Sequence, residues 1–199
     1  MYKVGITGGI GSGKSRVCSI LEGYGVAVYD ADSRAKGLMR DSLVLRDALV
    51  ARFGQEVYTN EGINRAYLAE RVFSDAEELK ALNAIVHPAV MDDFDRWAME
   101  QEGDYVVLES AILFEAHLED RVDVVVAVMA PAELRLERAM LRDGASREQI
   151  ESRMRNQLTD EERVERAKYA IVNIDIEELV DDVEQLHRRL SYDAKTLGY

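Results

Sequence analysis

A glycine-rich run near the N-terminus carries residues that could bind the phosphates of a nucleotide. Gly8-Gly9-Ile10-Gly11-Ser12-Gly13-Lys14-Ser15 fits the pattern G-x-x-x-x-G-K-[ST], the P-loop. Its glycines can take positive φ, so successive N–H groups can converge on phosphate oxygens. Lys14 is expected to reach the β- and γ-phosphates, and the Ser15 hydroxyl to bind Mg²⁺. The run therefore predicts a nucleoside triphosphate site. A turn that only joins a strand to a helix would need these residues to fall in register by chance.

The segments around the P-loop predict a strand before it and a helix after it. Tyr2, Val4 and Ile6 suit a strand packed on both faces, and Val17, Ile20 and Leu21 recur at helical spacing. Further strands are expected at residues 26–29, 105–109, 122–129 and 169–172. Strands that alternate with helices favour a parallel sheet. We therefore expect an α/β fold with a five-stranded parallel sheet flanked by helices.

Two carboxylates follow the second predicted strand. Ligands in such folds bind beyond the carboxyl ends of the strands, so Asp30 and Asp32 are expected to point towards the phosphate site. The alternative is that one of them only caps a helix from Ser33 to Met39. Capping needs one acid, whereas the sequence supplies two.

The helical pattern from Asp41 to Glu102 is too long for an ordinary crossover between strands. We interpret residues 41–102 as an acceptor-binding insertion, interrupted at residues 54–64. Within it, Ser74-x-x-Glu77 predicts a capping box, and His87-Pro88 predicts a new helix with proline at its first position. The remaining core is expected at residues 1–40, 103–136 and 167–199, within a single domain.

Arginines are concentrated in a helical region at residues 137–166, which we expect to close over ATP as a lid. Ser146-x-x-Gln149 and Thr159-x-x-Glu162 predict capping boxes there. Arg142, beside the Asp143-Gly144 turn, is the best candidate for contacting nucleotide. For most of the other arginines, ion pairs on a solvated helix face are the simpler explanation. A short P-loop, an acidic pair, an insertion and this lid together indicate a small-molecule kinase.

Composition narrows the class of protein and its surroundings. A net charge of −13 argues against non-specific nucleic-acid binding, and no apolar run approaches the ~20 residues that span a bilayer. The N-terminal strand is not expected to be a signal peptide. Cys18 is the single cysteine, so an internal disulfide is excluded, and this composition is typical of a protein in the reducing cytoplasm. We expect the Cys18 thiol to be buried and inert. The three histidines (His87, His117 and His187) are expected to be structural, without the spacing of a zinc site. The oligomeric state stays open.

Several motifs in this order resemble the dephospho-coenzyme A kinase family. They are the run Gly5 to Ser15, Asp30-Ala31-Asp32, Asn83 to Pro88, Leu113-Phe114-Glu115, the Arg142-Asp143 turn, Gln157 and Ile171-Val172-Asn173. The resemblance covers nearly the whole chain. It implies phosphorylation by ATP of the ribose 3′-hydroxyl of dephospho-coenzyme A, the last step of coenzyme A synthesis.

The resemblance also implies roles for single residues. Asp32 would accept or orient the 3′-hydroxyl proton, Lys14 would hold phosphates, Ser15 would bind Mg²⁺, and Arg142 would contact ATP from the lid. Asn173 would lie near the adenine. The expected ATP contacts are Gly9, Ile10, Gly11, Ser12, Gly13, Lys14, Ser15, Arg16, Arg142 and Asn173. The pattern is not matched at Ala111-Ile112, at Arg16 or at Asp175.

Two other functions are consistent with the same motifs. Another P-loop kinase, acting on a nucleoside or a small alcohol, would share every feature up to the choice of acceptor. A non-catalytic nucleotide switch would bind ATP without transferring phosphate, and it would not need the Asp30 and Asp32 pair.

Overall fold

The computed structural model describes residues 1–72 and 75–199, and it divides into two compact units. The first unit comprises Met1–Asp30 and Trp97–Tyr199, and the second comprises Ala31–Arg96. The insertion expected at residues 41–102 falls largely in the second unit, which starts earlier, at Ala31. None of the helices in the described part of the chain is long and apolar enough to cross a membrane.

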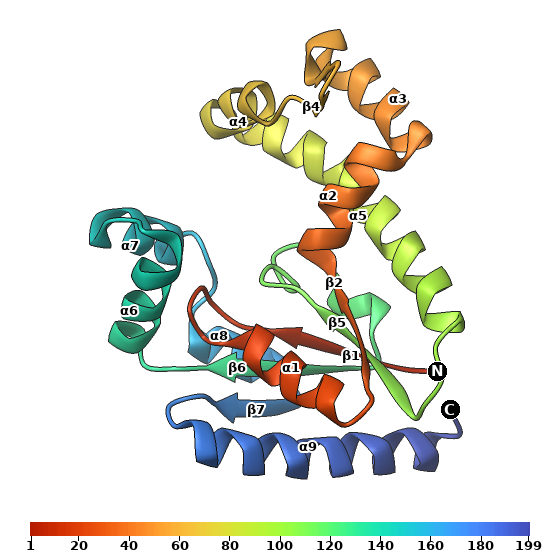
Figure 1. Cartoon of the computed structure of the whole chain (residues 1–199), viewed down its shortest axis with the longest axis vertical. Coiled ribbons are helices and arrows are strands. Elements are labelled where there is room, and N and C mark those ends of the chain that lie inside the picture. Colours follow the sequence, from red (N-terminus) through yellow and green to blue (C-terminus); the bar gives the residue numbers. More distant parts are fainter. The chain divides into compact units, whose positions relative to one another are not determined.

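The first unit contains the expected five-stranded parallel sheet, in the order β2-β5-β1-β6-β7 (Figure 1). Its strands are β1 (Tyr2–Thr7), β2 (Ala27–Asp30), β5 (Tyr105–Glu109), β6 (Val124–Met129) and β7 (Tyr169–Val172). The valine-rich strands are buried on both faces, because helices cover both sides of a parallel sheet. β1 is central, so the loop that follows it lies at the middle of the sheet's carboxyl edge.

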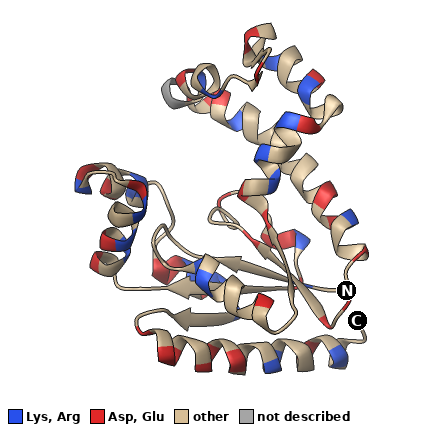
Figure 2. Ribbon diagram, in the orientation of Figure 1, with Lys and Arg blue, Asp and Glu red and all other residues tan. Residues whose placement is uncertain are grey.

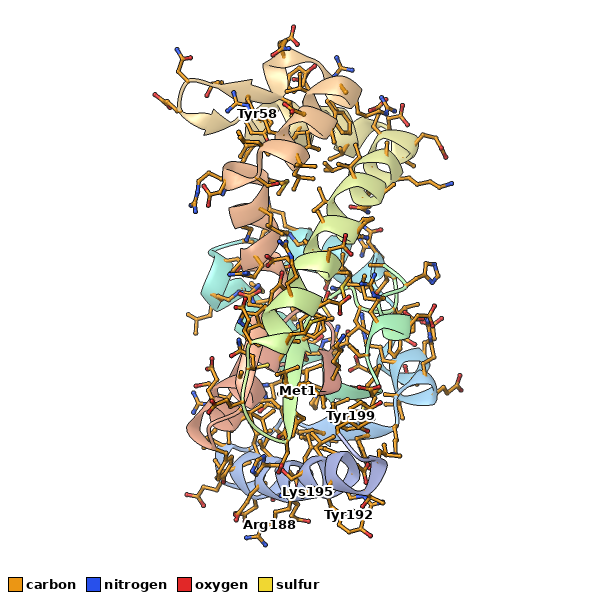
Figure 3. All side chains as sticks on the ribbon, turned by 90° about the vertical axis from the view of Figure 1, so that its right-hand side faces the viewer. Met1, Tyr58, Arg188, Tyr192, Lys195 and Tyr199 are labelled. Atoms are coloured by element: carbon orange, nitrogen blue, oxygen red, sulfur yellow. The ribbon has the colours of Figure 1, made fainter. Side chains whose placement is uncertain are left out.

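One face of this sheet is covered by α1 (Lys14–Gly23) and α9 (Ile176–Leu197), which pack against each other. Leu179, Val183, Leu186 and Leu190 of α9 are buried in the core cluster that also contains residues of α1 and of four strands, β1, β5, β6 and β7. The opposite face of α9 carries charged and aromatic side chains, among them Arg188, Tyr192 and Lys195 (Figure 3). This amphipathic helix therefore closes the hydrophobic core on that side.

Three helices follow β6: α6 (Ala132–Asp143), α7 (Arg147–Arg155) and α8 (Asp160–Arg166). Both predicted capping boxes are confirmed, at Ser146 with Gln149 and at Thr159 with Glu162. Gly144 ends α6 with φ 62°. Basic and acidic residues are mixed along α6 and α7 (Figure 2). Both helices bury a small apolar cluster of Leu136, Ala139 and Ile150.

The second unit is mostly helical. It contains α2 (Ala31–Asp41), α3 (Leu43–Phe53), α4 (Arg65–Ser74) and most of α5 (Ala76–Met99). The interruption expected at residues 54–64 contains a short 3₁₀ turn (Gln55–Val57) and a hairpin of β3 (Tyr58–Thr59) and β4 (Gly62–Ile63). This hairpin was not expected, because two strands of two residues leave no periodic signal. The capping box predicted at Ser74 falls on a side chain outside the described residues.

The prediction of a new helix at His87-Pro88 is wrong, because Pro88 lies inside α5. Proline removes one backbone hydrogen bond and usually ends a helix. Here Val86, Val90 and Phe94 are all buried at spacings of one helical turn on both sides of the proline. This continuous apolar stripe keeps the two segments in one helix.

The helix after the second strand is longer than the predicted span from Ser33 to Met39. β2 ends at Asp30 and α2 begins at once with Ala31. Asp32 is therefore inside the helix, in its first turn, where a carboxylate interacts favourably with the helix dipole.

Candidate active site

The P-loop lies between β1 and α1, at the carboxyl edge of the sheet (Figure 1). Gly11 and Gly13 have φ of 76° and 90°, a region that side chains with a Cβ rarely adopt. Gly13 is the N-cap of α1, so Lys14 and Ser15 form the first turn of that helix. The N–H groups at a helix N-terminus attract anions, so this end of α1 stays the expected phosphate site.

No larger residue fits at Gly11 or Gly13, because other parts of the protein occupy the space where a Cβ would lie. A Cβ on Gly13 would lie 1.9 Å from Nδ2 of Asn173, and one on Gly11 would lie 2.1 Å from the carbonyl oxygen of Arg135. Asn173 is buried, and its Nδ2 donates a hydrogen bond to the Ser12 carbonyl oxygen at 2.8 Å. The loop is thus held from behind by residues far away in the sequence.

Lys14 and its neighbours lie where a triphosphate is expected to bind. Lys14 Nζ donates a hydrogen bond to the Gly8 carbonyl oxygen at 3.0 Å, across the loop. Ser15 and Arg16 are exposed at the start of α1. An exposed hydroxyl next to an ammonium, on an anion-attracting helix end, suits Mg²⁺ bound to a triphosphate.

Ile10 connects the P-loop to the arginine-rich helices through both of its backbone polar groups. Its N–H donates to Gln157 Oε1 at 2.8 Å, and its carbonyl oxygen accepts from Arg135 Nε at 3.2 Å. Arg135 comes from α6, and Gln157 precedes α8. The base of the predicted lid is therefore hydrogen-bonded to the loop that is expected to hold ATP.

Buried charges extend this connection. Arg135 Nη1 lies 2.6 Å from Asp160 Oδ1, and Arg163, whose side chain has no exposed surface, donates to Glu115 Oε1 at 3.1 Å. Burial lowers the pKa of Arg163, although the neighbouring carboxylates oppose this effect. Arg135 and Arg163 were not predicted as site residues, because arginines in amphipathic helices are normally solvent-exposed. Asp160 was not predicted because an acid in the first turn of a helix is common on the surface. The one available signal in the sequence was that Arg135 lies next to the apolar positions Leu136 and Ala139, on the side of α6 that is buried.

Arg142 lies at the end of α6, beside the predicted Asp143-Gly144 turn, and its side chain is held by its neighbour Asp143. Its guanidinium donates to both carboxylate oxygens of Asp143, at 2.7 and 3.1 Å, which raises the pKa of Arg142 and lowers that of Asp143. Arg153 binds the same carboxylate at 2.9 Å. Arg147 pairs with Glu133 and Glu151. The proposed ATP contact of Arg142 stays a prediction, whereas Arg147, Arg153 and Arg166 form the expected surface ion pairs.

Acids end two neighbouring strands of the sheet, β2 and β5. Asp30 and Glu109 are paired residues at the ends of β2 and β5, and Glu109 also pairs with Ile6 of β1. Both Glu109 and Lys14 influence the buried thiol of Cys18. Burial raises the pKa of this thiol, the charge of Glu109 raises it further, and the charge of Lys14 lowers it. Glu109 and Lys14 are thus close enough to affect one group. Glu109 was not among the residues predicted for the site, because only the pairing of distant strands brings it next to Asp30.

The comparisons identify the family. A family model described as dephospho-CoA kinase matches residues 2–178. The chain belongs to the dephospho-CoA kinase family. A relative from Bacteroides fragilis, named dephospho-CoA kinase, is 43% identical over 92% of this chain and 90% of its own. A second, from Porphyromonas gingivalis and with the same name, is 47% identical over 79% of this chain and 78% of its own.

Solved structures agree with this assignment. A Thermus thermophilus protein matches with a TM-score of 0.84 and 36% identity, over 95% of this chain and 97% of that one. A dephospho-CoA kinase from Campylobacter jejuni matches with a TM-score of 0.67 and 25% identity, over 96% and 98% of the two chains. An Acinetobacter baumannii shikimate kinase, 16% identical with a TM-score of 0.56, shares the fold. The expected P-loop kinase fold is confirmed.

Proposed function

We propose that this protein transfers the γ-phosphoryl group of ATP to the ribose 3′-hydroxyl of dephospho-coenzyme A, giving coenzyme A and ADP. Family membership along nearly the whole chain carries this proposal. The reaction would complete coenzyme A synthesis, and we propose that it takes place in the cytoplasm.

The P-loop supplies the ATP-binding half of the site. Main-chain N–H groups of residues 9–16 would surround the phosphates, and Lys14 would exchange its hydrogen bond to Gly8 for the β- and γ-phosphates. Arg142 would leave Asp143 in part to face the nucleotide when the lid helices close. Closure would also exclude water, which competes with the acceptor hydroxyl for the phosphoryl group.

The role of Asn173 is best supported as a brace for the P-loop, from its hydrogen bond to Ser12. The resemblance also places this residue near the adenine. The two roles are compatible, because the side chain of Asn173 can hold the P-loop while the main chain that follows β7 contacts the adenine.

Mg²⁺ fits the donor set at the start of α1. The Ser15 hydroxyl is exposed beside Lys14, and hard oxygen ligands are those that Mg²⁺ prefers. The ion would neutralise part of the charge that develops on the phosphates.

Asp32 is proposed to act on the acceptor. It is exposed in the first turn of α2, so its carboxylate is accessible to a ligand. It would orient the 3′-hydroxyl and accept its proton as the new P–O bond forms. Because phosphoryl transfer has a loose transition state, orientation of the hydroxyl can contribute as much as removal of the proton.

A coupled assay of ADP release tests the proposed function. Dephospho-coenzyme A should be turned over with ATP and Mg²⁺, in preference to nucleosides and simple alcohols. Preference for one of those acceptors would favour another P-loop kinase, and ATP binding without transfer to any acceptor would favour a nucleotide switch. Either result would overturn the proposal.

An Asp32→Asn variant tests the acceptor half. We expect turnover to fall by about 10² or more with little change in ATP binding, the usual size of a general-base effect. Asp47→Asn, which neutralises an exposed acid on α3, is the matched control. Equal turnover in both variants would remove Asp32 from the mechanism.

A further inference from the structure

A recess of about 300 Å³ lies entirely within the second unit, outside the P-loop. One wall is the face of α2 that presents Ser33, Lys36, Gly37 and Arg40, at spacings of three, four and seven from the first. The other wall is the β3–β4 turn and the start of α4, including Gly62 and Arg65.

The walls of the recess are fixed to each other by hydrogen bonds. The Tyr58 hydroxyl donates to the Met39 carbonyl oxygen at 2.5 Å, which ties the hairpin to α2. Thr59 Oγ1 accepts from Glu61 N at 3.2 Å and donates to the Gly62 carbonyl oxygen at 3.3 Å, which shapes the turn. Hydrogen bonds within the chain therefore hold the two walls together.

The charges that line the recess are mainly positive, in a protein whose net charge is −13. Lys36, Arg40 and Arg65 face a single acid, Glu61. Arg40 is held by Asp41 on the exposed surface. Within the described residues, Lys36 and Arg65 have neither an ion pair nor a side-chain hydrogen bond.

This situation is unusual in the second unit, where most cations have partners. Arg34 pairs with Asp93, Arg52 pairs with Glu78, and Arg46 stacks on Tyr58. Two cations that have no partner among the described residues, on facing walls, suit a compact dianion.

Gly37 leaves room for such a ligand against α2. A Cβ built at this position would have no atom within 4 Å. Glycine inside a helix costs about 0.5–1 kcal/mol relative to alanine. The glycine therefore lowers the stability of α2 although the protein itself has room for a methyl group at this position.

We infer that this recess binds the diphosphate group of the acceptor. The inference rests on the proposed function and deepens it. Asp32 and Lys36 are four residues apart on α2, so they are neighbours on one helix face, about 6 Å apart. In the acceptor, the 3′-oxygen and the first phosphorus are joined through C3′, C4′, C5′ and O5′, a path that spans about one helical turn. One face of α2 can therefore read both the ribose hydroxyl and the diphosphate.

Kinetics of Lys36→Ala and of the double variant Lys36→Ala/Arg65→Ala test this assignment. The KM for dephospho-coenzyme A should rise about tenfold in the single variant and further in the double one, since both remove bonds to a charged group. The KM for ATP should stay within about twofold, because the P-loop is untouched. Lys80→Ala is the matched control, since Lys80 is exposed in the same unit, has no partner among the described side chains and lies outside the recess. An unchanged KM for the acceptor, or an equal rise for ATP, would overturn the inference.

Gly37→Ala provides a readout that damage to the fold cannot imitate. The variant should melt at a higher temperature and still show a higher KM for dephospho-coenzyme A. Gly23→Ala, at the end of α1 and also in open space, should gain stability without that change in KM. A Gly37→Ala variant with unaltered KM would contradict a ligand in this space.

Calorimetry separates failure of this inference from failure of the proposed function. Dephospho-coenzyme A is titrated into the protein holding a non-hydrolysable ATP analogue. If the wild type binds it but shows no turnover, the proposed function fails, and weaker binding by Lys36→Ala still supports the recess. If the wild type turns over normally and Lys36→Ala binds equally well, the recess is not the diphosphate site.

Discussion

The side-chain amide of Asn173 donates a hydrogen bond to the carbonyl oxygen of Ser12, 2.8 Å away and out of contact with solvent. The Asn173 carbonyl oxygen accepts a hydrogen bond from the Arg138 guanidinium at 2.9 Å, and the Asn173 N–H donates to the Met129 carbonyl oxygen at 2.7 Å. The end of β7 therefore fixes the P-loop from behind. A phosphate-binding loop that is fixed before the ligand arrives loses less entropy on binding.

Replacing Asn173 should weaken ATP binding as well as the fold. Asn173→Ala leaves a buried carbonyl without its partner, which typically costs about 1–3 kcal/mol of unfolding free energy. We expect the KM for ATP to rise several-fold. Ser42→Ala, which removes the cap of α3, should lower stability and leave the KM for ATP unchanged. Parallel kinetic behaviour of the two variants would show that Asn173 acts through stability alone.

Gln157 should affect ATP binding through the amide of Ile10. Gln157→Met keeps the shape of the side chain and removes the acceptor that lies 2.8 Å from this N–H. We expect the KM for ATP to rise several-fold at a stability loss of about 1 kcal/mol. Gln101→Met, which removes a hydrogen bond to the Trp97 carbonyl oxygen, is the control and should show only the stability loss. No difference in KM between them would argue against coupling of this helical region to the loop.

Arg163→Met should be strongly destabilising. The guanidinium is fully buried between Glu115 and Asp160, and removing one member of a buried ion pair typically costs about 3–5 kcal/mol. Chemical denaturation measures this loss. In the double variant with Glu115→Gln the loss should be smaller than the sum of the two single losses, because the uncompensated carboxylate is then absent. Additive losses would indicate that the two groups do not interact.

His87 should make the fold sensitive to mild acid. Burial lowers its pKa below the ordinary value of 6.5, so the unfolded chain takes up a proton more readily than the folded one. The stability contribution of neutral His87 is thus present above about pH 6.5 and is lost as the pH falls. Urea midpoints between about pH 5 and pH 7.5 should fall less steeply for His87→Gln than for the wild type. The exposed His117, tested as His117→Asn, is the control, and identical slopes for His87→Gln and wild type would contradict this account.

Local patterns were sufficient to predict the sheet, the P-loop turn and the capping boxes at Ser146 and Thr159. A motif such as Gly8 to Ser15 specifies its own strand, turn and helix, and buried strands such as Val124–Met129 are recognisable from continuous apolar residues. Pro88 was misread because local propensity was overridden by packing on both sides of it.

The chain by itself determined the family, the parallel sheet and the residues expected to hold a triphosphate, because these depend on short spacings along the sequence. Only the tertiary structure decided what surrounds them. Arg135, Gln157 and Asn173 contact the P-loop across more than a hundred residues, and Lys36 faces Arg65 across a recess. Contacts between distant residues depend on how the elements pack, and no local pattern of residue types encodes that.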